Sequence, residues 1–326
     1  MSHPICLLNI GGVPASAGVM SRLISCTVTD KEGFSADTID IELLGGPYVG
    51  VPRGTIITCS MGYEDGGVAF MGSFKVDEGE IHCLPYTVKI QGKSADMREK
   101  LKEHRERHFE NKSVKDIVSQ IAGEHGLSAQ VDAAVGAHKY PWFGQQNESS
   151  LHVLRRLADR HGALLAIKNG KLIFGKKGAG LSAAGALVSS IVVTPQMIVE
   201  GTCSVKFAER PAHNEASGAW HDQGEAERKH EDAPAGSGSA HYSLRHAYAD
   251  QDEAKAAAAS KGKDLQRSGD TTSVTIIGNP AARGGGNMSY AGVHVQADGR
   301  PWVIETATHS FSKQGYTTQI EAKARV

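Results

Sequence analysis

Apolar and polar residues alternate along the first part of the chain, from about residue 5 to about residue 91. A period of two is typical of β-strands that bury one face. Glycine and proline separate these runs, as in Gly45-Gly46-Pro47, and they indicate turns. Several short strands at this spacing predict a small antiparallel barrel or sandwich. The predicted strands are 23–29, 38–43, 55–59, 68–74 and 86–90.

The pattern changes to a helical period near residue 93. The polar run 98–112 predicts a charged helix, and Ser113 caps an amphipathic helix directly after it. Ser149 or Ser150 caps a second amphipathic helix. A hairpin with an Asn-Gly turn follows this helix. Residues 96–178 are therefore predicted to form a compact α/β insertion.

Strand-like runs return in the last third of the chain, on both sides of a polar stretch. Residues 208–243 contain no Val, Ile, Leu, Met or Phe, so they predict a long exposed loop without a core of its own. An Ala-rich helix is predicted over 250–267, because Asp250 followed by Glu253 resembles a capping box. The predicted strands are 187–193, 197–207, 273–277, 292–296, 302–308 and 317–322.

Together these segments predict a β-rich α+β protein. Its first small antiparallel β-barrel domain spans residues 1–95, and the inserted α/β domain spans 96–178. A second small antiparallel β-barrel domain spans 179–326 and includes the exposed polar loop and the Ala-rich helix.

Composition narrows the classes of function. Apolar residues make up 40% and charged residues 22% of the 326 residues, as in globular proteins. The 35 basic and 36 acidic residues nearly cancel, so no global field favours nucleic acid and we predict no stable nucleic-acid binding. The five cysteines form no Cys-x-x-Cys pair and are expected to be buried reduced thiols. No signal peptide or long apolar segment is evident, so we expect no membrane insertion and folding in the cytoplasm.

The sequence predicts no catalytic residue, no cofactor-binding residue and no metal ligand. His104 and His108 have metal-ligand spacing, but Arg105 stands where a metalloprotease needs Glu and the neighbouring basic residues repel a cation. Four histidines in the polar loop lack rigid support for a defined site. Nucleophile elbows, phosphate-binding loops and dinucleotide fingerprints are absent from the sequence. We therefore expect a protein that is not an enzyme and needs no cofactor.

Two stretches of the sequence carry a recognisable motif. The first reads Gln145-Gln146-Asn147-Glu148-Ser149-Ser150-Leu151, then Arg156-Leu157-Ala158 and Gly162. The second reads Trp302-Val303-Ile304, Thr308-His309-Ser310 and Gly315-Tyr316-Thr317-Thr318. The first resembles the Gln-x-Asn-Glu-Ser-Asp signature of the phage late control D proteins with its following Leu, Arg-Leu-Ala and Gly, although Ser150 stands where Asp is usual, and the second resembles the closing strand pair of that family. These proteins are baseplate hub subunits of contractile tails and are related to the hub part of type VI secretion spike proteins.

The resemblance covers the chain from about residue 112 to its end and implies a structural role. Family hubs form a threefold ring with two barrels in each subunit, so that six barrels face the hexameric tail tube and the other face accepts the trimeric spike. The implied partners are the other copies of a homotrimer, the spike protein, the tail tube protein, the tape-measure protein and other baseplate proteins. The implied location is the virion's tail baseplate, after assembly in the host cytoplasm.

Two other functions stay open at this point. One is a hub-associated enzyme that degrades peptidoglycan, and the other is a nucleic-acid-binding regulator of late genes. Four polar residues near the first motif are predicted to contact other elements or neighbouring subunits, with a local hydrogen-bonding role as the alternative. They are Gln146, Asn147, Glu148 and Arg155.

Overall fold

The computed structural model contains two compact units, and each combines segments that are distant in the sequence. The first unit comprises Met1–Met97, Val188–Ser204 and Thr272–Ala322, and the second comprises Arg98–Leu187, Val205–Thr271 and Lys323–Val326. This division differs from the three consecutive domains expected, because segments of both expected barrels share the first unit. The structure describes residues 3–33, 35–45, 51–94, 99–168, 170–176, 190–207, 213–267 and 270–325.

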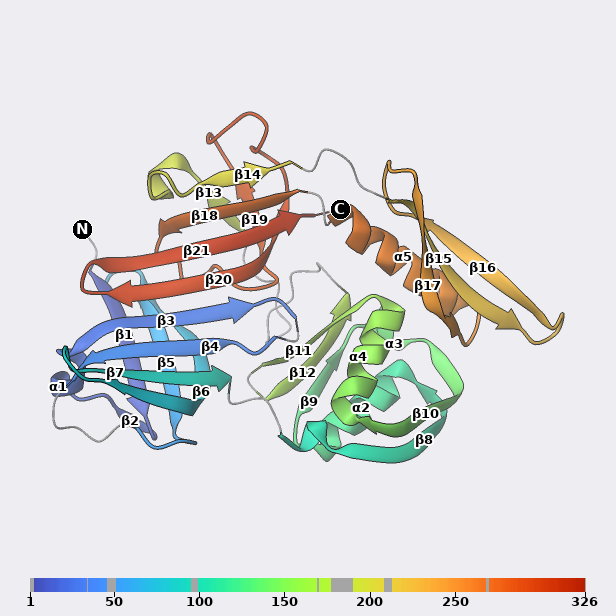
Figure 1. The fold of residues 1–326 in the computed structure, drawn as a ribbon, viewed down its shortest axis with the longest axis horizontal. Helices are drawn as coiled ribbons and strands as arrows, with labels where there is room; N and C mark the ends of the chain where they lie inside the picture. The colour runs from blue at the N-terminus through green and yellow to red at the C-terminus, as the bar shows by residue number, and fades with distance from the viewer. Residues whose placement is uncertain are drawn as a thin grey trace. The chain divides into compact units, whose positions relative to one another are not determined.

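The first unit consists almost entirely of β-strands (Figure 1). The predicted strands before residue 95 are confirmed, and so are those near residues 273–277, 302–308 and 317–322. The N-terminal elements are β1 (Pro4–Ile10), β2 (Val13–Pro14), α1 (Ala17–Met20), β3 (Leu23–Lys31), β4 (Thr38–Leu44), β5 (Ile56–Tyr63), β6 (Gly67–His82) and β7 (Thr87–Ser94). The later elements are β13 (Ile191–Val193), η2 (Pro195–Met197), β14 (Ser204–Lys206), β18 (Thr271–Ile277), β19 (Asn287–Tyr290), β20 (Trp302–Ser312) and β21 (Gly315–Ala324).

One sheet joins the N-terminal and C-terminal strands of this unit. Its order is β14-β18-β21-β20-β3-β4-β7-β6-β5-β1-β2, with β19 beside β20 and β13 beside β19. The junction is the antiparallel pair of β3 and β20, which runs from Thr306 opposite Lys31 to Ser312 opposite Ser25 (Figure 1). The β-rich α+β class is thus confirmed with large antiparallel sheets, while the described strands follow an open path and not a closed barrel.

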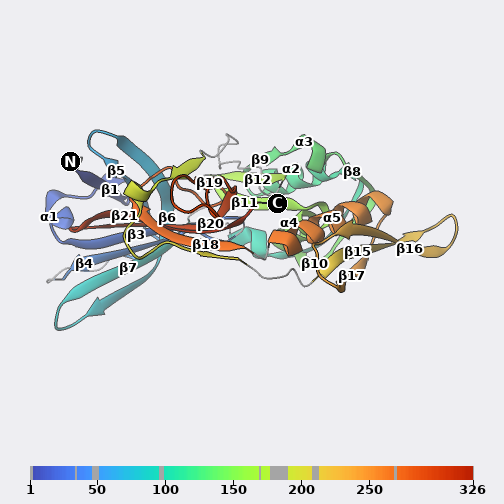
Figure 2. The same ribbon diagram turned by 90° about the horizontal axis from the view of Figure 1, so that it is seen from above.

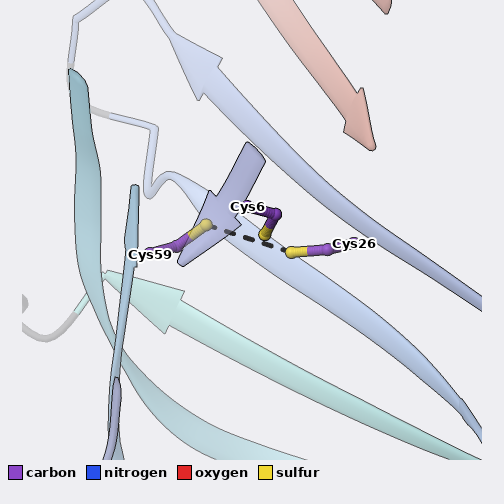
Figure 3. A group of neighbouring side chains, drawn as sticks. All are labelled: Cys6, Cys26 and Cys59. Atoms are coloured by element: carbon purple, nitrogen blue, oxygen red, sulfur yellow. Dashed lines mark hydrogen bonds between the residues drawn. The ribbon is translucent and has the colours of Figure 1, made fainter. Parts of the chain in front are cut away.

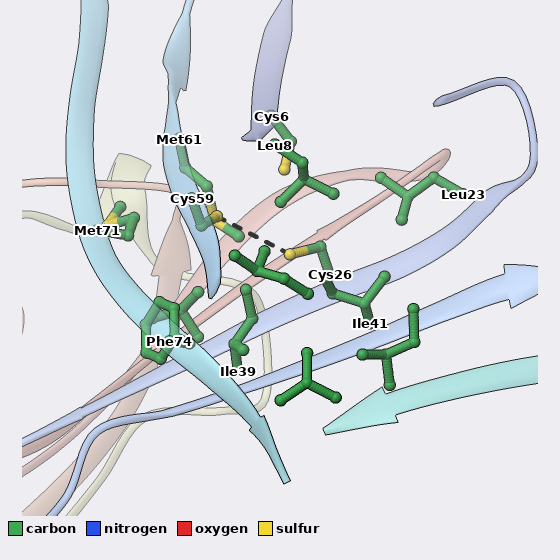
Figure 4. Close-up of a cluster of buried hydrophobic side chains, with 14 of the residues drawn as sticks. Cys6, Leu8, Leu23, Cys26, Ile39, Ile41, Cys59, Met61, Met71 and Phe74 are labelled. Atoms are coloured by element: carbon green, nitrogen blue, oxygen red, sulfur yellow. Dashed lines mark hydrogen bonds between the residues drawn. The ribbon is translucent and has the colours of Figure 1, made fainter. Parts of the chain in front are cut away.

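The hydrophobic core of the first unit lies on the inner face of the N-terminal strands (Figure 4). The alternation of apolar and polar residues explains the position of this core, because every second residue of a strand points to the same face. Burying each aliphatic side chain stabilises the fold by about 1.5–3 kcal/mol. The fully or nearly fully buried residues include Cys6, Leu8, Leu23, Cys26, Val28, Ile39, Ile41, Ile57, Cys59, Met61, Phe74 and Ile90.

Among the described residues, the second unit combines three small sheets with four α-helices and one 3₁₀ helix. β8 pairs with β10, β12 lies between β11 and β9, and β15 lies between β16 and β17. The elements are η1 (Glu99–Lys102), β8 (His104–Ser113), α2 (Val114–Glu124), β9 (Ser128–Val131), α3 (Ala133–Gly136), β10 (Lys139–Ser149), α4 (Ser150–His161), β11 (Ala163–Lys168), β12 (Lys171–Lys176), β15 (His213–Asp222), β16 (Glu227–Pro234), β17 (Ala240–Tyr248) and α5 (Gln251–Arg267).

Both predicted amphipathic helices of this unit are confirmed. Ser113 caps α2 in a full capping box, because its hydroxyl accepts from the backbone of Asp116 and the Asp116 carboxylate accepts from the backbone of Ser113. Ser149, and not Ser150, caps α4. Gly162 ends α4 in the left-handed conformation, with φ of 61°, as expected for a C-terminal glycine.

The helix expected over residues 98–112 is wrong for most of its length. A short 3₁₀ turn occupies Glu99–Lys102, and His104–Ser113 then forms β8. The run has little apolar periodicity of its own, so its conformation is decided by a partner, and its partner is β10. His104 and His108 therefore do not share the face of a helix.

The exposed loop expected over residues 208–243 is also wrong within the described residues. The three strands β15, β16 and β17 form a sheet there, and α5 lies along it (Figure 1, Figure 2). Small residues make this packing close: a Cβ at Gly218 would lie 2.7 Å from the carbonyl oxygen of Ala254, and a Cβ at Gly262 would lie 2.4 Å from that of Pro234. The packed surface of this sheet is thus built from Ala, Gly and Ser, and the absence of large apolar residues does not indicate a loop here.

The expected strand over residues 292–296 is not formed, and β19 precedes it. Instead, the carboxylate of Asp298 accepts hydrogen bonds from the backbone of Gly292, Val293 and His294 at 3.0–3.3 Å, which folds the segment into a turn. The Ala-rich helix over 250–267 is confirmed as α5. None of the helices in the described ranges is long and apolar enough to cross a membrane.

Candidate functional site

The polar residues of the first motif lie where β10 leads into α4. β10 pairs regularly with β8 as far as Gln145 opposite Arg107, and the register then shifts before Glu148. The shift is a β-bulge, and within it Asn147 adopts a φ of 48°, a left-handed conformation that Asn tolerates better than most residues. The bulge leaves the side chains of Gln146 and Asn147 exposed to solvent.

Glu148 connects β10 to α4 within the second unit. Its carboxylate accepts a short hydrogen bond from Arg156, whose guanidinium also donates to the carbonyl of Gly144 at 2.6 Å. The guanidinium carbon lies 4.3 Å from the centre of the Phe143 ring, which adds a cation–π contact. The contacts of Glu148 described by the structure are thus local.

Arg155 lies on the exposed face of α4. The residue that meets Glu148 is its neighbour Arg156, and the reason is helical phase. Residues four apart share a face of a helix, so Arg156 follows His152, whose ring nitrogen lies 3.8 Å from Glu148. This spacing was available in the sequence and would have favoured Arg156 over Arg155.

Gln145 is the buried member of the motif and was not among the predicted site residues. Its side chain is fully buried, donates to the carbonyl of Glu148 at 2.7 Å and accepts from Nε of Arg107 at 2.7 Å. Arg107 in turn donates to both oxygens of Glu124 at 2.6 and 2.8 Å. Burial opposes the charge of Glu124, but Arg107 holds the pKa of its carboxyl below the ordinary value. Gln145 therefore fixes the bulge from inside.

A pocket of about 360 Å³ opens beside the bulge, within the second unit. Aromatic and cationic side chains line it, and the side chain of Trp142 is more than half exposed. Such a mixture suits a polar segment of another protein better than a small apolar ligand. The lining residues are Tyr140, Trp142, Phe143, Gly144, Gln146, Glu148, Arg156, Arg160 and Ala249.

A buried network centred on Glu253 lies behind this pocket. Glu253 comes from the first turn of α5, and its side chain is completely buried. It accepts a short hydrogen bond from the hydroxyl of Tyr140, a hydrogen bond of 2.7 Å from the backbone of Ala249, and an ion pair of 3.1 Å from Arg160. The Tyr140 hydroxyl also lies 2.8 Å from Nε2 of His161.

The environment of this network sets its charges. Burial opposes ionisation of Glu253, but Arg160 and the backbone N–H of Ala249 hold its pKa below the ordinary value, so it is a carboxylate. Burial and the charge of Glu253 raise the pKa of Tyr140. Burial lowers the pKa of His161 to about 4, so this histidine is neutral near pH 7. The network joins β10, α4 and α5, and no group in it is poised as a nucleophile or base facing solvent.

The second motif forms a hydrogen-bonded core in the first unit. His309 is completely buried, and its Nε2 donates to the carbonyl of Ala282 at 2.9 Å. Its Nδ1 then accepts from the hydroxyls of Tyr316 at 2.8 Å and Thr318 at 3.2 Å. Burial lowers the pKa of His309 to about 4. The motif thus positions β20 and β21 against the loop after β18, which is a structural role.

The histidines once expected in a flexible loop lie on the strands of the second unit. His230 of β16 lies 3.4 Å from the hydroxyl of Ser217, and His241 of β17 lies 3.5 Å from Glu215. Lys229 pairs with Asp222 at 2.7 Å. Within the described residues, no group of three metal-binding side chains gathers here.

Known proteins resemble this chain over most of its length. The family model described as phage tail baseplate hub (GPD) matches residues 57–315. The chain is 28% identical to the probable baseplate hub protein of Escherichia phage P2, across 99% of this chain and 94% of that protein. It is 27% identical to the probable baseplate hub protein of Escherichia phage 186, across 99% of this chain and 93% of that protein.

Solved structures of tail proteins share the fold. A 43 kDa tail protein from prophage MuSo2 of Shewanella oneidensis superimposes with a TM-score of 0.68 at 14% identity, covering 97% of both chains. A tail protein from Neisseria meningitidis has a TM-score of 0.68 at 12% identity, covering 98% of this chain and 96% of that chain. An Escherichia coli component of the type VI secretion system has a TM-score of 0.57 at 10% identity, covering 98% and 77%.

Proposed function

The chain belongs to the phage tail baseplate hub family, and from this premise we propose that it is a structural hub subunit of a contractile tail or tail-like particle. The observation that carries the proposal is the match of residues 57–315, because it spans segments of both units and includes both motifs up to Gly315. The relatives from phages P2 and 186 extend the likeness to nearly the whole chain.

In the proposed assembly, three copies of the chain form a ring that joins the hexameric tail tube to the trimeric central spike. The N-terminal strands and the C-terminal strands of the first unit act as the two barrel-like halves of each subunit, so that three subunits offer six tube-facing surfaces. The antiparallel pairing of β3 with β20 supports this, since it makes the two halves one continuous sheet. A threefold ring can match a sixfold tube only if each subunit presents two similar surfaces.

Two exposed apolar side chains on the outer face of the N-terminal strands, Leu7 and Phe70, support a subunit that buries surface against other chains. Leu7 of β1 lies opposite Ser60 of β5, and Ser60 lies opposite Phe70 of β6. Leu7 is 56% exposed and Phe70 is 49% exposed. Exposed apolar side chains gathered on one face of a sheet favour a protein–protein contact.

Further partners follow from the same proposal. The spike protein, the tail tube protein, the tape-measure protein and other baseplate proteins contact the hub, which assembles in the host cytoplasm and resides in the tail of the virion. Gln146, Asn147 and Arg155 contact a neighbouring subunit or partner, because their side chains are exposed beside the pocket of the second unit or on the outer face of α4. The hub performs no catalysis and binds no nucleic acid stably.

Light scattering tests whether the chain forms a trimer together with the spike protein. The chain is co-expressed with the spike protein of the same particle, and the complex is purified and its mass is measured. We expect a mass that corresponds to three chains of 34.6 kDa with a spike trimer, and a threefold ring in electron micrographs. A chain that stays monomeric in the presence of the spike protein would contradict the proposal.

Two direct assays address the other functions. Zymography on peptidoglycan is expected to show no clearing, and a cleared zone would favour a hub-associated hydrolase. Binding to duplex DNA is expected to be undetectable even at low salt, where electrostatic attraction is strongest. Salt-dependent binding would favour a regulator of late genes.

A further inference from the structure

Three cysteine side chains meet in the core of the first unit (Figure 3). Cys6 lies on β1, Cys26 on β3 and Cys59 on β5, and their side chains are 3%, 0% and 0% exposed. The three Sγ atoms all lie within 4.8 Å of one another, and those of Cys26 and Cys59 are 3.9 Å apart. In the described part of the chain, this is the one group of three metal-binding side chains within reach of a single ion.

The cluster is brought together by the fold and not by sequence spacing. β1 and β5 are neighbours in the sheet, but β3 is separated from β5 by β4, β7 and β6. Cys26 therefore reaches the other two thiols across the core (Figure 4). All three cysteines are free, and a sulfur separation of 3.9 Å is far longer than the bond of about 2 Å in a disulfide.

We propose that Cys6, Cys26 and Cys59 form a three-sulfur binding site for a soft metal ion, and that Cu(I) is the ion it takes. Metal–thiolate distances are about 2.3 Å, so three sulfurs around one ion in a trigonal arrangement lie about 4 Å apart. The spacing of Cys26 and Cys59 already has this value, and the remaining sulfurs need to approach by less than 1 Å or so to match it.

The surroundings favour Cu(I) over the harder or four-coordinate alternatives. Sulfur ligands select soft ions, whereas Mg²⁺ and Ca²⁺ prefer carboxylate and carbonyl oxygens, and no Asp or Glu of the described residues joins this group. Structural Zn²⁺ sites require a fourth ligand, and among the described residues the cluster offers three Cys, His, Asp or Glu side chains. The thioethers of Met61 and Met71 belong to the same core cluster, and thioethers also favour Cu(I).

A bound ion would connect three strands that are distant in the sheet order. Binding to the folded chain and not to the unfolded chain stabilises the fold, so the ion would act as a cross-link in a protein that has no disulfide among these cysteines. Because the sulfurs are buried, the ion enters while the sheet folds. The test therefore loads the metal during synthesis.

The full-length chain is expressed in medium with added copper or added zinc and purified without oxygen, and its metal content is measured by plasma mass spectrometry. We expect about one copper ion per chain in the first preparation. The variants Cys26→Ala and Cys59→Ala are expected to contain at least about tenfold less copper. The matched control Cys83→Ser, at an exposed cysteine outside the cluster, is expected to retain the full copper content.

X-ray absorption on the copper-loaded wild-type chain tests the site without relying on a variant that folds. We expect about three sulfur neighbours at about 2.3 Å. A shell of nitrogen or oxygen ligands, or equal copper content in the Cys26→Ala chain, would overturn the site. Zinc at one ion per chain with no copper uptake would overturn the choice of ion, and the absence of both metals would overturn the proposal as a whole.

Discussion

A single buried carboxylate, Glu253, organises the second unit at the scale of residues. Its Oε1 and Oε2 satisfy a tyrosine hydroxyl, a backbone N–H and the guanidinium of Arg160. We predict that Glu253→Gln lowers the free energy of unfolding by about 3–5 kcal/mol, because it leaves Arg160 largely buried without its counter-charge. Chemical denaturation followed by circular dichroism measures the loss.

The control for this prediction is Glu225→Gln. Glu225 pairs with Lys229 at 2.6 Å but is 64% exposed, so its loss is expected to change stability by at most about 1 kcal/mol. Equal effects at the two positions would mean that the Glu253 network contributes no more than a surface ion pair.

His309 gives the first unit a pH-dependent stability. Burial holds its folded-state pKa at about 4, below the ordinary value of 6.5, so the unfolded chain takes up a proton in this interval and the folded chain does not. The stabilisation is present above about pH 6.5 and is lost as the pH falls towards 4. We predict a loss of about 2 kcal/mol from this residue between about pH 7 and about pH 5.

Fluorescence of Trp302 can report on this unit alone, because the other two tryptophans, Trp142 and Trp220, belong to the second unit and can be replaced by Phe. In this background, His309→Gln is expected to be less stable near pH 7 but to lose less stability on acidification. An unchanged pH dependence in this variant would show that His309 is not the group that titrates.

The first motif and the residues near it show what the sequence could and could not predict about single residues. The cap at Ser113 follows from a local rule and was predicted correctly, and Gly162 ends α4 by a rule of the same kind. The pairing of Glu148 with Arg156 was within reach, because the four-residue spacing of a helix favours it over Arg155. The contact between Tyr140 and Glu253 was not within reach, since 113 positions separate them and no local pattern connects them.

At the scale of elements, the close packing of α5 on β15 and β16 depends on glycine. A Cβ at Gly262 would lie 2.4 Å from the carbonyl oxygen of Pro234, which is a backbone atom that cannot move alone. We predict that Gly262→Ala lowers the free energy of unfolding by about 1–3 kcal/mol, although alanine favours helices in general. Thermal unfolding of the variant measures this change.

Gly123 of α2 is the matched control for this substitution. It is exposed, and a Cβ there would meet no atom within 4 Å. Gly123→Ala is therefore expected to stabilise the chain by about 0.5–1 kcal/mol. Stabilisation by both substitutions would refute the close packing of α5.

The same element explains the largest error in the sequence analysis. Residues 208–243 lack large apolar side chains, and this composition predicts an exposed loop without a core of its own. The sheet nevertheless buries Ala216, Ser217 and Ala219 against the alanines of α5. Small side chains on both the sheet and the helix let the two pack closely, so the core needs no large apolar side chain. Burial depends on the partner surface as well as on the size of the side chain, and a single segment does not reveal its partner.

At the scale of the whole molecule, strand pairing is the feature that local patterns did not predict. The alternation in β3 and β20 correctly indicates strands, but their register joins Lys31 to Thr306 across most of the chain. This pairing places segments of the expected first and second barrels in one unit. The alternation of apolar and polar residues predicted most of these strands, whereas the shared sheet required the three-dimensional structure.

A substitution on the outer face of the N-terminal strands can test the proposed assembly without disturbing the fold. Phe70→Glu places a charge on the face that also carries Leu7, but the Phe70 side chain is 49% exposed, so the unfolding free energy is expected to change by no more than about 0.5 kcal/mol. If this face contacts another chain, the variant loses the trimeric mass in light scattering, because a buried unpaired charge disfavours association. Val295→Glu, at an apolar residue that is 88% exposed in a turn, is expected to assemble normally. Normal assembly of both variants would place the subunit contact on another face.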